Sequence, residues 1–315
     1  MPAGVVASGG GPVLVAGATG FLGRAIVRAL ASSGRTVLGL MRNPERAEWV
    51  RAAGGYPVRG DVLDERSLER AASGVEAIVH VAAHPGSDED DAESERRVRV
   101  EGTDHLARAA RANGVRRLVV GSGYWVYASS AGLLTEDSAT DPRGESAWNF
   151  DAERVALAAN RPGLLETVVV RPGMVYGDGA WFRATTEALQ RGDYVLIAPG
   201  TNRWSFVSLE DAAAGFVTVL DRGAPGSVYD LADGAPVEWI RFIDLVCREM
   251  GKQPPTPLEP SVARGTYGPV VTDHLSADRA MTAARLRALG WEPRDRDCGS
   301  GVPPLLRAIA RSERA

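Results

Sequence analysis

Short apolar runs alternate with helical patterns through the first half of the chain. In the helix predicted over Phe21–Ser32, one face carries Leu22, Ile26, Val27 and Leu30. The predicted strands are Pro12–Ala16, Thr36–Met41, Tyr56–Arg59, Ala77–Val81, Arg117–Gly121 and Thr167–Arg171. The other predicted helices are Arg46–Ala53, Glu65–Ser73, one that follows the polar loop Gly86–Glu95 and reaches Ala112, and Asn149–Asn160. Because such alternation is typical of βαβ units, we expect an α/β fold, a Rossmann-type doubly wound parallel sheet.

The pattern becomes less regular after Gly173. The sequence predicts short strands at Tyr194–Ile197, Ser205–Val207 and Ser227–Asp230, helices at Leu209–Leu220, Trp239–Met250 and Thr282–Leu289, and a proline-rich stretch at Gln253–Pro260. We expect these elements to form a smaller C-terminal, substrate-binding lobe over the carboxyl edge of the sheet, where open α/β folds bind ligands.

The composition of the chain argues against nucleic-acid binding, metal binding and membrane insertion. The 315 residues carry a net charge of −4, which argues against nucleic-acid binding as a main activity. Cys247 and Cys298 have no spacing typical of a zinc site or a disulfide framework, so no metal is expected. No apolar run reaches the roughly 18 residues needed to cross a bilayer. We expect a cytoplasmic protein that binds a small molecule, without a membrane or nucleic-acid partner. No oligomeric state follows from the sequence.

A glycine-rich turn follows the first predicted strand. Gly17 allows a tight turn, Gly20 lets the backbone approach a pyrophosphate, and Gly23 permits close packing of the helix, whose N-terminus faces the anion. A strand precedes this turn and a helix follows it, so the pattern predicts a dinucleotide site in preference to an incidental turn. The other residues of the turn that we expect to line the site are Thr19, Phe21 and Leu22.

The residues at the end of the second predicted strand indicate which pyridine nucleotide, NAD or NADP, the site is expected to bind. The run Met41-Arg42-Asn43 has no acidic residue to hold a ribose 2′-hydroxyl, whereas Arg42 can pair with the 2′-phosphate of NADP. The alternative is that Arg42 is a solvated surface arginine. Asp61 and Val62, just after the third strand, are expected to contact the adenine, although Asp61 can also be a helix N-cap. The sequence therefore predicts NADP(H) as the cofactor.

Five segments occur in an order that points to a known family. They are Gly17–Gly23 as GxxGxxG, Asp61, Val81-Ala82-Ala83, Arg171–Gly177 and Ser205–Ala212. Together they resemble the NAD-dependent epimerase/dehydratase family, the extended short-chain dehydrogenases/reductases, from about Pro12 to Leu289. The resemblance implies that Val81, Ala82 and Ala83 run beside the pyrophosphate and the adenosine ribose. It also implies that Pro172, Gly173 and Val175 contact the nicotinamide. The expected regions are a flexible tail (1–11), an NADP-binding Rossmann domain (12–172) and mainly a substrate-binding lobe with returning sheet elements (173–315).

The catalytic residues that this resemblance implies are missing. Members of the family use a tyrosine acid, a lysine four residues later on the same helix face, a serine or threonine after the fifth strand, and a supporting asparagine. No tyrosine lies between Tyr127 and Tyr176, and the only lysine is Lys252. Alignment on the neighbouring motifs puts other residues at these four positions, namely Glu145, Asn149, Gly123 and Arg99.

Other polar and aromatic side chains surround the expected reaction centre. The candidate catalytic residues are Ser122, Tyr124 and Asn149, of which Ser122 and Asn149 are also expected to contact the cofactor, Asn149 at the nicotinamide ribose. The candidate substrate-binding residues are Tyr124, Trp125, Trp148, Tyr176 and Trp181. Such aromatics suit a flat, hydrophobic substrate better than a sugar nucleotide. The alternative is that they only pack beneath the smaller lobe.

These features favour an NADPH-dependent ketoreductase acting on a planar aromatic or polyketide ketone, in antibiotic or other secondary-metabolite biosynthesis. A general acid contributes about 10²–10⁴-fold, so its loss slows reduction without preventing it, and a hydroxyl beside the ketone can supply the proton. With one lysine among 36 basic residues, the chain also resembles actinomycete tailoring reductases of aromatic polyketides, the angucyclinone ketoreductases among them. The alternatives are a non-catalytic NADP-binding redox sensor, similar to NmrA-like regulators, and a sugar-nucleotide epimerase or dehydratase.

Overall fold

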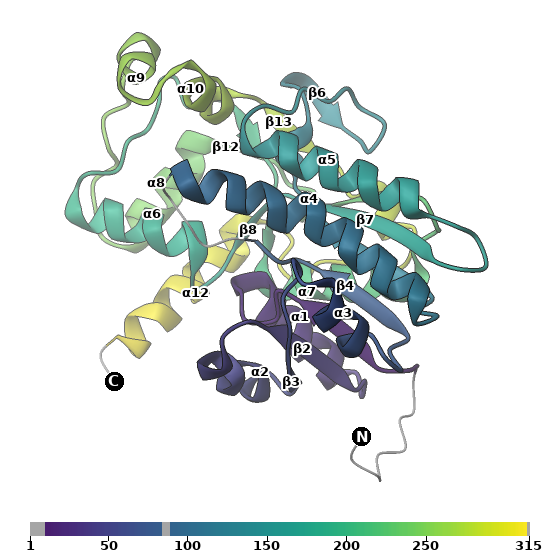
Figure 1. Ribbon diagram of the computed structural model, residues 1–315. Coiled ribbons are helices and arrows are strands. Elements are labelled where there is room, and N and C mark those ends of the chain that lie inside the picture. Colours follow the sequence, from purple (N-terminus) through teal and green to yellow (C-terminus); the bar gives the residue numbers. More distant parts are fainter. Residues whose placement is uncertain (1–9, 84–88, 314–315) are drawn as a thin grey trace.

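Seven parallel strands form the central sheet, which confirms the predicted Rossmann-type fold (Figure 1). The computed structural model describes residues 10–83 and 89–313, apart from the side chains of residues 89–92 and 145, so most of the predicted tail lies outside the described residues. In spatial order the strands are β11 (Val228–Leu231), β7 (Glu166–Pro172), β5 (Arg117–Gly121), β4 (Ala77–His80), β1 (Val13–Ala16), β2 (Val37–Met41) and β3 (Tyr56–Arg59). The strand order reverses beside β1, where a doubly wound sheet opens a crevice for a ligand.

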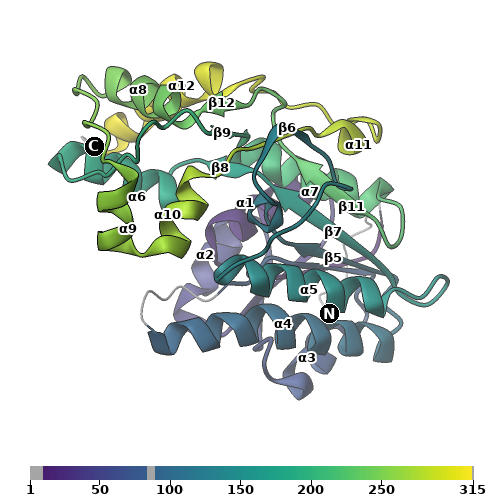
Figure 2. The ribbon, with the colours of Figure 1, turned by 90° about the horizontal axis from the view of Figure 1, so that it is seen from above.

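Helices cover both faces of this sheet (Figure 2). One face carries α3 (Glu65–Ala71), α4 (Glu89–Ala112) and α5 (Glu145–Ala159), and the other carries α1 (Phe21–Ser32), α2 (Ala47–Ala52) and α7 (Leu209–Arg222). Because both faces are covered, the central strands are continuous apolar runs without the alternation of a half-exposed strand. All four residues of β1 are buried, which is why its pattern was readable from the sequence.

Short elements from distant parts of the chain build the second lobe (Figure 2). Its four-stranded sheet contains β12 (Val237–Glu238), β9 (Arg203–Trp204), β13 (Arg279–Met281) and β6 (Ser130–Leu134). A separate pair joins β8 (Met174–Tyr176) to β10 (Phe206–Ser208). The helices are α6 (Ala180–Arg191), α8 (Trp239–Glu249), α9 (Pro260–Tyr267), α10 (Pro269–Ser276), α11 (Ala284–Arg287) and α12 (Cys298–Ser312). No helix of the described chain is long and apolar enough to cross a membrane.

The Ser205–Ala212 motif fastens the end of the chain to the rest of the molecule. The Ser205 hydroxyl donates to the Met281 carbonyl at 3.1 Å and accepts from the Met281 amide at 2.9 Å. The Asp211 carboxylate accepts from the backbone N–H groups of Arg294 and Asp295, both at 3.0 Å. Both side chains are buried, so they satisfy backbone groups that water does not reach.

Several elements differ from the sequence prediction. Tyr194–Ile197 is not a strand, because Ile197 makes only an isolated bridge, with Leu258. The long helix α4 begins at Glu89, inside the predicted polar loop, since acidic residues suit a helix N-terminus. The helix predicted over Thr282–Leu289 is reduced to the short α11. Helix α12 was not predicted, because it contains Pro303 and Pro304, which ordinarily interrupt a helix.

Candidate functional site

The glycine turn between β1 and α1 has the shape that a dinucleotide needs. Gly17 has a φ of +93°, and a Cβ there would lie 2.7 Å from the Ala82 nitrogen and from the Val81 carbonyl. A Cβ on Gly23 would lie 1.9 Å from the Gly17 carbonyl oxygen. Gly20 caps α1 without a side-chain hydrogen bond, and the first turn contains no acidic residue. The N-terminus of α1 is therefore open to a phosphate group, and the turn fits a dinucleotide cofactor.

A cleft of about 890 Å³ extends from this turn along the carboxyl ends of β1, β2 and β3. It brings together most of the predicted cofactor residues: Gly17, Thr19, Gly20, Phe21, Leu22, Gly23, Arg42, Asp61, Val62, Val81, Ala82 and Ala83. The cleft is also lined by residues for which no cofactor role was predicted, namely Leu40, Met41, Asn43, Arg46, Gly60, Val98 and Ala180. The glycine turn could be predicted because its residues have a characteristic local spacing. The additional lining residues come from separate elements, so no local pattern marks them.

Arginines gather at the end of the cleft where β2 stops. Arg42 and Arg46 both line it. The Arg46 guanidinium lies 5.1 Å from the Trp49 ring centroid, and the Arg24 guanidinium lies at the same distance from that ring. Asp61 lines the cleft and accepts a hydrogen bond from the Leu63 amide at 3.0 Å, so it closes a local turn. It is not the N-cap of α3, a position that Asp64 occupies.

The remaining predicted cofactor residues are not part of this cleft. Ser122 follows β5, Asn149 lies in the second turn of α5, and Pro172, Gly173 and Val175 lie where β7 passes into β8. The Val175 carbonyl accepts a hydrogen bond from the Trp181 indole at 2.6 Å. These residues lie further along the carboxyl edge of the sheet, in the direction of the smaller lobe.

Two of the substituted catalytic positions contact one another. Helix α5 begins at Glu145, four residues earlier than predicted, so Asn149 faces α4. Arg99 of α4 donates from Nη1 to Asn149 Oδ1 at 2.5 Å, and its Nε donates to the Glu95 carboxylate. A Cβ on Gly123 would lie 3.9 Å from Asn149 Nδ2. The positions aligned with the lysine, the asparagine and the serine or threonine are therefore neighbours, while the Glu145 side chain lies outside the described residues.

Ser122 and Tyr124 present two unsatisfied hydroxyl groups at the end of β5. Both oxygens are buried, and neither has a hydrogen-bond partner among the described residues. Burial raises the pKa of the Tyr124 phenol well above its usual value, although the nearby Arg279 acts in the opposite direction. Buried polar groups in native proteins are almost always paired, so these two hydroxyls lack the partners that a native structure ordinarily supplies. At neutral pH the phenol is a hydrogen-bond donor and a poor acid.

Aromatic rings continue from Tyr124 into the smaller lobe. Trp125 stacks on His274 with centroids 4.0 Å apart, and its ring lies 4.2 Å from Tyr124 and 5.1 Å from Trp204. Trp204 in turn contacts Trp239 at 4.3 Å. His274 and these two tryptophans were not predicted to join the site, because they arrive on α10, β9 and α8, far along the chain.

Two predicted substrate residues have different surroundings. Trp181 contacts the same cluster through Trp239, with centroids 6.1 Å apart. Trp148 is half-buried in α5 and makes none of the ring contacts found in the described chain. The aromatic cluster is therefore built by Tyr124, Trp125 and Trp181 together with residues of the lobe.

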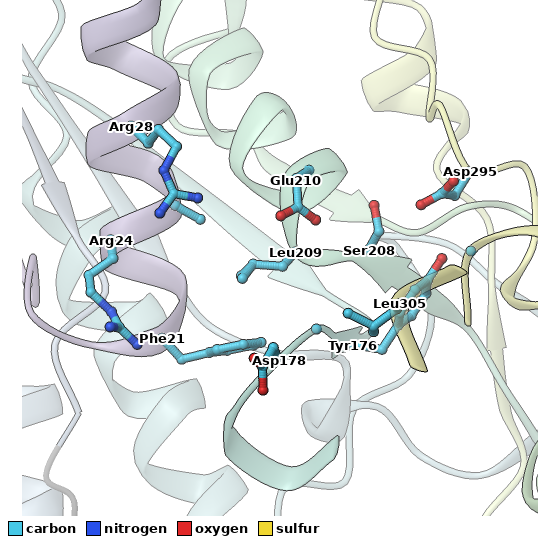
Figure 3. Close-up of a pocket in the computed structure, with 13 residues that line it drawn as sticks. Phe21, Arg24, Arg28, Tyr176, Asp178, Ser208, Leu209, Glu210, Asp295 and Leu305 are labelled. Carbon is cyan, nitrogen blue, oxygen red and sulfur yellow. The ribbon is translucent and has the colours of Figure 1, made fainter. Parts of the chain in front are cut away.

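Tyr176 lies apart from Tyr124 and Trp125. It lines a second pocket, of about 290 Å³, behind Phe21 (Figure 3). Its hydroxyl faces α12, because a Cβ on Gly301 would lie 2.0 Å from it. Charged side chains surround this pocket, with Arg24 and Arg28 on the α1 side and Glu210 and Asp295 opposite them (Figure 3).

Arg171, the first residue of the family segment Arg171–Gly177, anchors the base of the site. It donates to both Glu153 carboxylate oxygens at 2.8 and 2.6 Å and to the Tyr127 hydroxyl at 2.9 Å. The Tyr127 hydroxyl donates to Asp230 at 2.7 Å. Burial raises the pKa of Asp230 to about 8. This buried chain of hydrogen bonds ties α5, β7 and β11 together, so it fixes the elements that carry Asn149 and the segment expected to contact the nicotinamide.

Comparisons with known proteins all point to one family. Residues 13–232 match the NAD dependent epimerase/dehydratase family. The chain is 33% identical over 244 residues to the 4-hydroxy-2-methyl-3-oxo-4-farnesyl-3,4-dihydroquinoline-1-oxide ketoreductase of Stigmatella aurantiaca, covering 75% of this chain and 72% of that protein. It is 32% identical over 297 residues to the 3-diazoavenalumate denitrifying reductase of a Streptomyces species, covering 89% and 95%.

A solved structure supports the same assignment. A double mutant of DesIV, a dTDP-glucose 4,6-dehydratase from Streptomyces venezuelae with NAD and DAU bound, superposes with a TM-score of 0.78. It is 25% identical to this chain, and the match covers 94% of this chain and 95% of that one. Together with the turn and the cleft, this likeness supports a pyridine nucleotide as the cofactor. The chain belongs to the NAD-dependent epimerase/dehydratase family and is an oxidoreductase that uses a pyridine nucleotide.

Proposed function

We propose that the protein is an NADPH-dependent ketoreductase that acts on a planar aromatic or polyketide ketone in antibiotic or other secondary-metabolite biosynthesis. The observation that carries this proposal is the pair of buried, unpartnered hydroxyls of Ser122 and Tyr124, next to a cluster of aromatic rings. A ketone oxygen accepts hydrogen bonds and donates none, so it complements two orphaned donors. The flat face of Trp125, already stacked on His274, suits a planar ring.

The relatives support the reductase part of this proposal. Two relatives over 30% identical are named as a ketoreductase and a reductase, and a third, 29% identical, is a 2-alkyl-3-oxoalkanoate reductase of Stenotrophomonas maltophilia. The farnesyl quinoline oxide named for the first of them combines a ketone with a fused ring system and a large apolar group. Arg42 and Arg46 at the end of β2 favour NADPH, because a guanidinium binds a phosphate through charge-assisted hydrogen bonds.

The residues of the chain would divide the work of reduction as follows. When bound, reduced nicotinamide supplies a hydride for the carbonyl carbon. Ser122 and Tyr124 would donate hydrogen bonds to the carbonyl oxygen, and Asn149 would hold the nicotinamide ribose. The aromatic cluster would clamp the flat substrate and exclude water. Cys247 and Cys298 are unpaired and buried, which fits work in the reducing cytoplasm.

The proton for the product alcohol would come from the substrate. Tyr124 keeps its proton at neutral pH, because burial raises its pKa, and Ser122 has no base beside it in the described chain. A hydroxyl adjacent to the ketone would give its proton to the alkoxide as the C–H bond forms, and would regain a proton from water after release. The chain then needs no tyrosine–lysine pair.

Conservative removal of each hydroxyl tests this division of roles. We expect Ser122→Ala and Tyr124→Phe each to lower kcat by less than about tenfold, since one neutral hydrogen bond contributes about 0.5–1.5 kcal/mol. The measurement is steady-state NADPH oxidation with aromatic ketones and quinones, beside titration of NADPH into each variant. A thousandfold loss in either variant, with NADPH binding intact, would identify that side chain as the acid. Tight NADPH binding without oxidation by any of these ketones would favour a redox sensor.

A further inference from the structure

Arg99 occupies a constrained position between α4 and α5. Its guanidinium is held at two points, by Asn149 Oδ1 and by the Glu95 carboxylate one turn earlier on α4. About a quarter of the Arg99 side chain is exposed, against 13% for Glu95, so the contact lies largely inside the helix interface. A guanidinium fixed by two partners gives up little further conformational freedom when a ligand binds.

The charge of Arg99 acts on the carboxyl edge of the sheet. His80, the last residue of β4, has its pKa lowered to about 4, mainly by burial and further by the positive charge of Arg99. Arg99 therefore lies close to the end of β4, and through Asn149 it reaches Gly123, just after β5. This is the edge at which the family's lysine would place its ammonium group.

The bond from Arg99 also settles which way the Asn149 amide points. A guanidinium only donates hydrogen bonds, so the amide oxygen must face it. The amide nitrogen is then turned toward the end of β5, where it lies 3.9 Å from the Cβ position of Gly123. Within the described residues, Asn149 Nδ2 makes no hydrogen bond of its own. Among the described residues, Asn149 Nδ2 is thus a donor without a partner near Gly123, and the positive charge of Arg99 lies on the other side of the amide.

We propose that Arg99 is a positioning residue that replaces the absent lysine in two parts. Its guanidinium supplies the positive charge, and its bond to Asn149 turns the Asn149 amide nitrogen toward the hydroxyl groups of the nicotinamide ribose. This inference rests on the proposed placement of Asn149 at the cofactor. Without Arg99, the amide could rotate and present its oxygen, which cannot donate to a ribose hydroxyl.

A double-mutant cycle on NADPH affinity tests the proposal without any ketone. We expect Arg99→Met and Asn149→Ala each to raise the Kd for NADPH about three- to tenfold. The double variant should have a Kd no higher than that of the single variant that binds more weakly, because each single substitution already removes the same contact. Arg99→Lys keeps a charge and a donor but loses the fork that reaches both Asn149 and Glu95, so its Kd should lie between those of the wild type and Arg99→Met. The matched control is Arg97→Met on the exposed side of α4, where Arg97 pairs with Glu101, and it should leave the Kd unchanged.

The amide itself is tested by Asn149→Asp. This variant keeps an oxygen for Arg99 but loses the nitrogen donor, so we expect it to weaken NADPH binding as much as Asn149→Ala while its melting temperature stays at or above the wild-type value. Independent, additive effects in the cycle, or an Asn149→Asp variant that binds NADPH normally, would overturn the proposal. Coupling between Arg99 and Asn149 in a protein that reduces no ketone would instead refute the proposed ketoreductase activity and leave this inference standing.

Discussion

At the scale of single residues, the expected preference for NADPH rests on the arginines at the end of β2. Arg42 was predictable, because its place after the second strand and the absence of an acidic neighbour are visible in the sequence. Arg46 was not, since its approach to the cleft depends on the short turn Pro44–Arg46 and on packing against Trp49. At Asp61, the position after the third strand was also predictable. That its carboxylate closes a local turn by accepting from the Leu63 amide was not.

Removing the Arg42 guanidinium should reduce the preference for NADPH. We expect the wild type to bind NADPH at least about tenfold more tightly than NADH, because a hydrogen bond to a charged group contributes about 1.5–3 kcal/mol. Arg42→Ala should lose most of that difference by weakening NADPH alone, as measured by titration of both cofactors. Arg51→Ala, on the exposed side of α2, is the control. Equal affinities for the two cofactors in the wild type would refute the expected preference.

At the scale of elements, the parallel sheet was predictable, whereas the strand pairings of the smaller lobe were not. Strands such as β1 and β5 are continuous apolar runs followed by helices, so their periodicity identifies them. Strand β6 has mostly exposed side chains and pairs with β13, more than 140 residues later. Such pairings leave no local signal. For the same reason, the aromatic cluster around Trp125 was predicted only in part, through Tyr124, Trp125 and Trp181.

The contact between Arg99 on α4 and Asn149 on α5 bears on whether the family's residue pair can be restored. We expect the double variant Glu145→Tyr, Asn149→Lys to show no gain in kcat on the native substrate. A lysine at position 149 would meet the Arg99 guanidinium where Asn149 Oδ1 now accepts from it, and two like charges in a partly buried interface repel. Steady-state kinetics check this expectation. A gain of tenfold or more would mean that the original machinery was lost without any rebuilding of the pocket.

At the scale of the whole molecule, buried titratable groups make stability depend on pH in opposite directions. Burial lowers the pKa of His80 and of His274 to about 4, so both are neutral in the folded protein at pH 7. Burial raises the pKa of Asp230 to about 8 and that of Asp233 to about 7. The carboxyl groups therefore favour the folded state below pH 4, and this contribution is lost as the pH rises toward 8.

His80 should make the protein sensitive to acid. Because the pKa of His80 is lower in the folded protein than in the unfolded chain, its contribution to the free energy of unfolding is complete above about pH 6.5. This contribution, about 3 kcal/mol, is lost as the pH falls through 4. Urea unfolding of wild type and His80→Gln at pH 7 and pH 5 isolates this contribution from those of the carboxyl groups. We expect the wild type to lose more stability than the variant between these two pH values. Equal losses would show that His80 titrates normally in the folded protein.

The central claim, reduction of a flat ketone with a proton from the substrate itself, is tested most directly by one pair of compounds. The two aromatic ketones share a ring system, and one carries a hydroxyl beside the ketone where the other carries a methyl ether. We expect the hydroxy ketone to drive NADPH oxidation with a kcat at least about a hundredfold higher, the lower end of what a general acid contributes. Equal kcat values for the two ketones would contradict the claim and assign the proton to the protein.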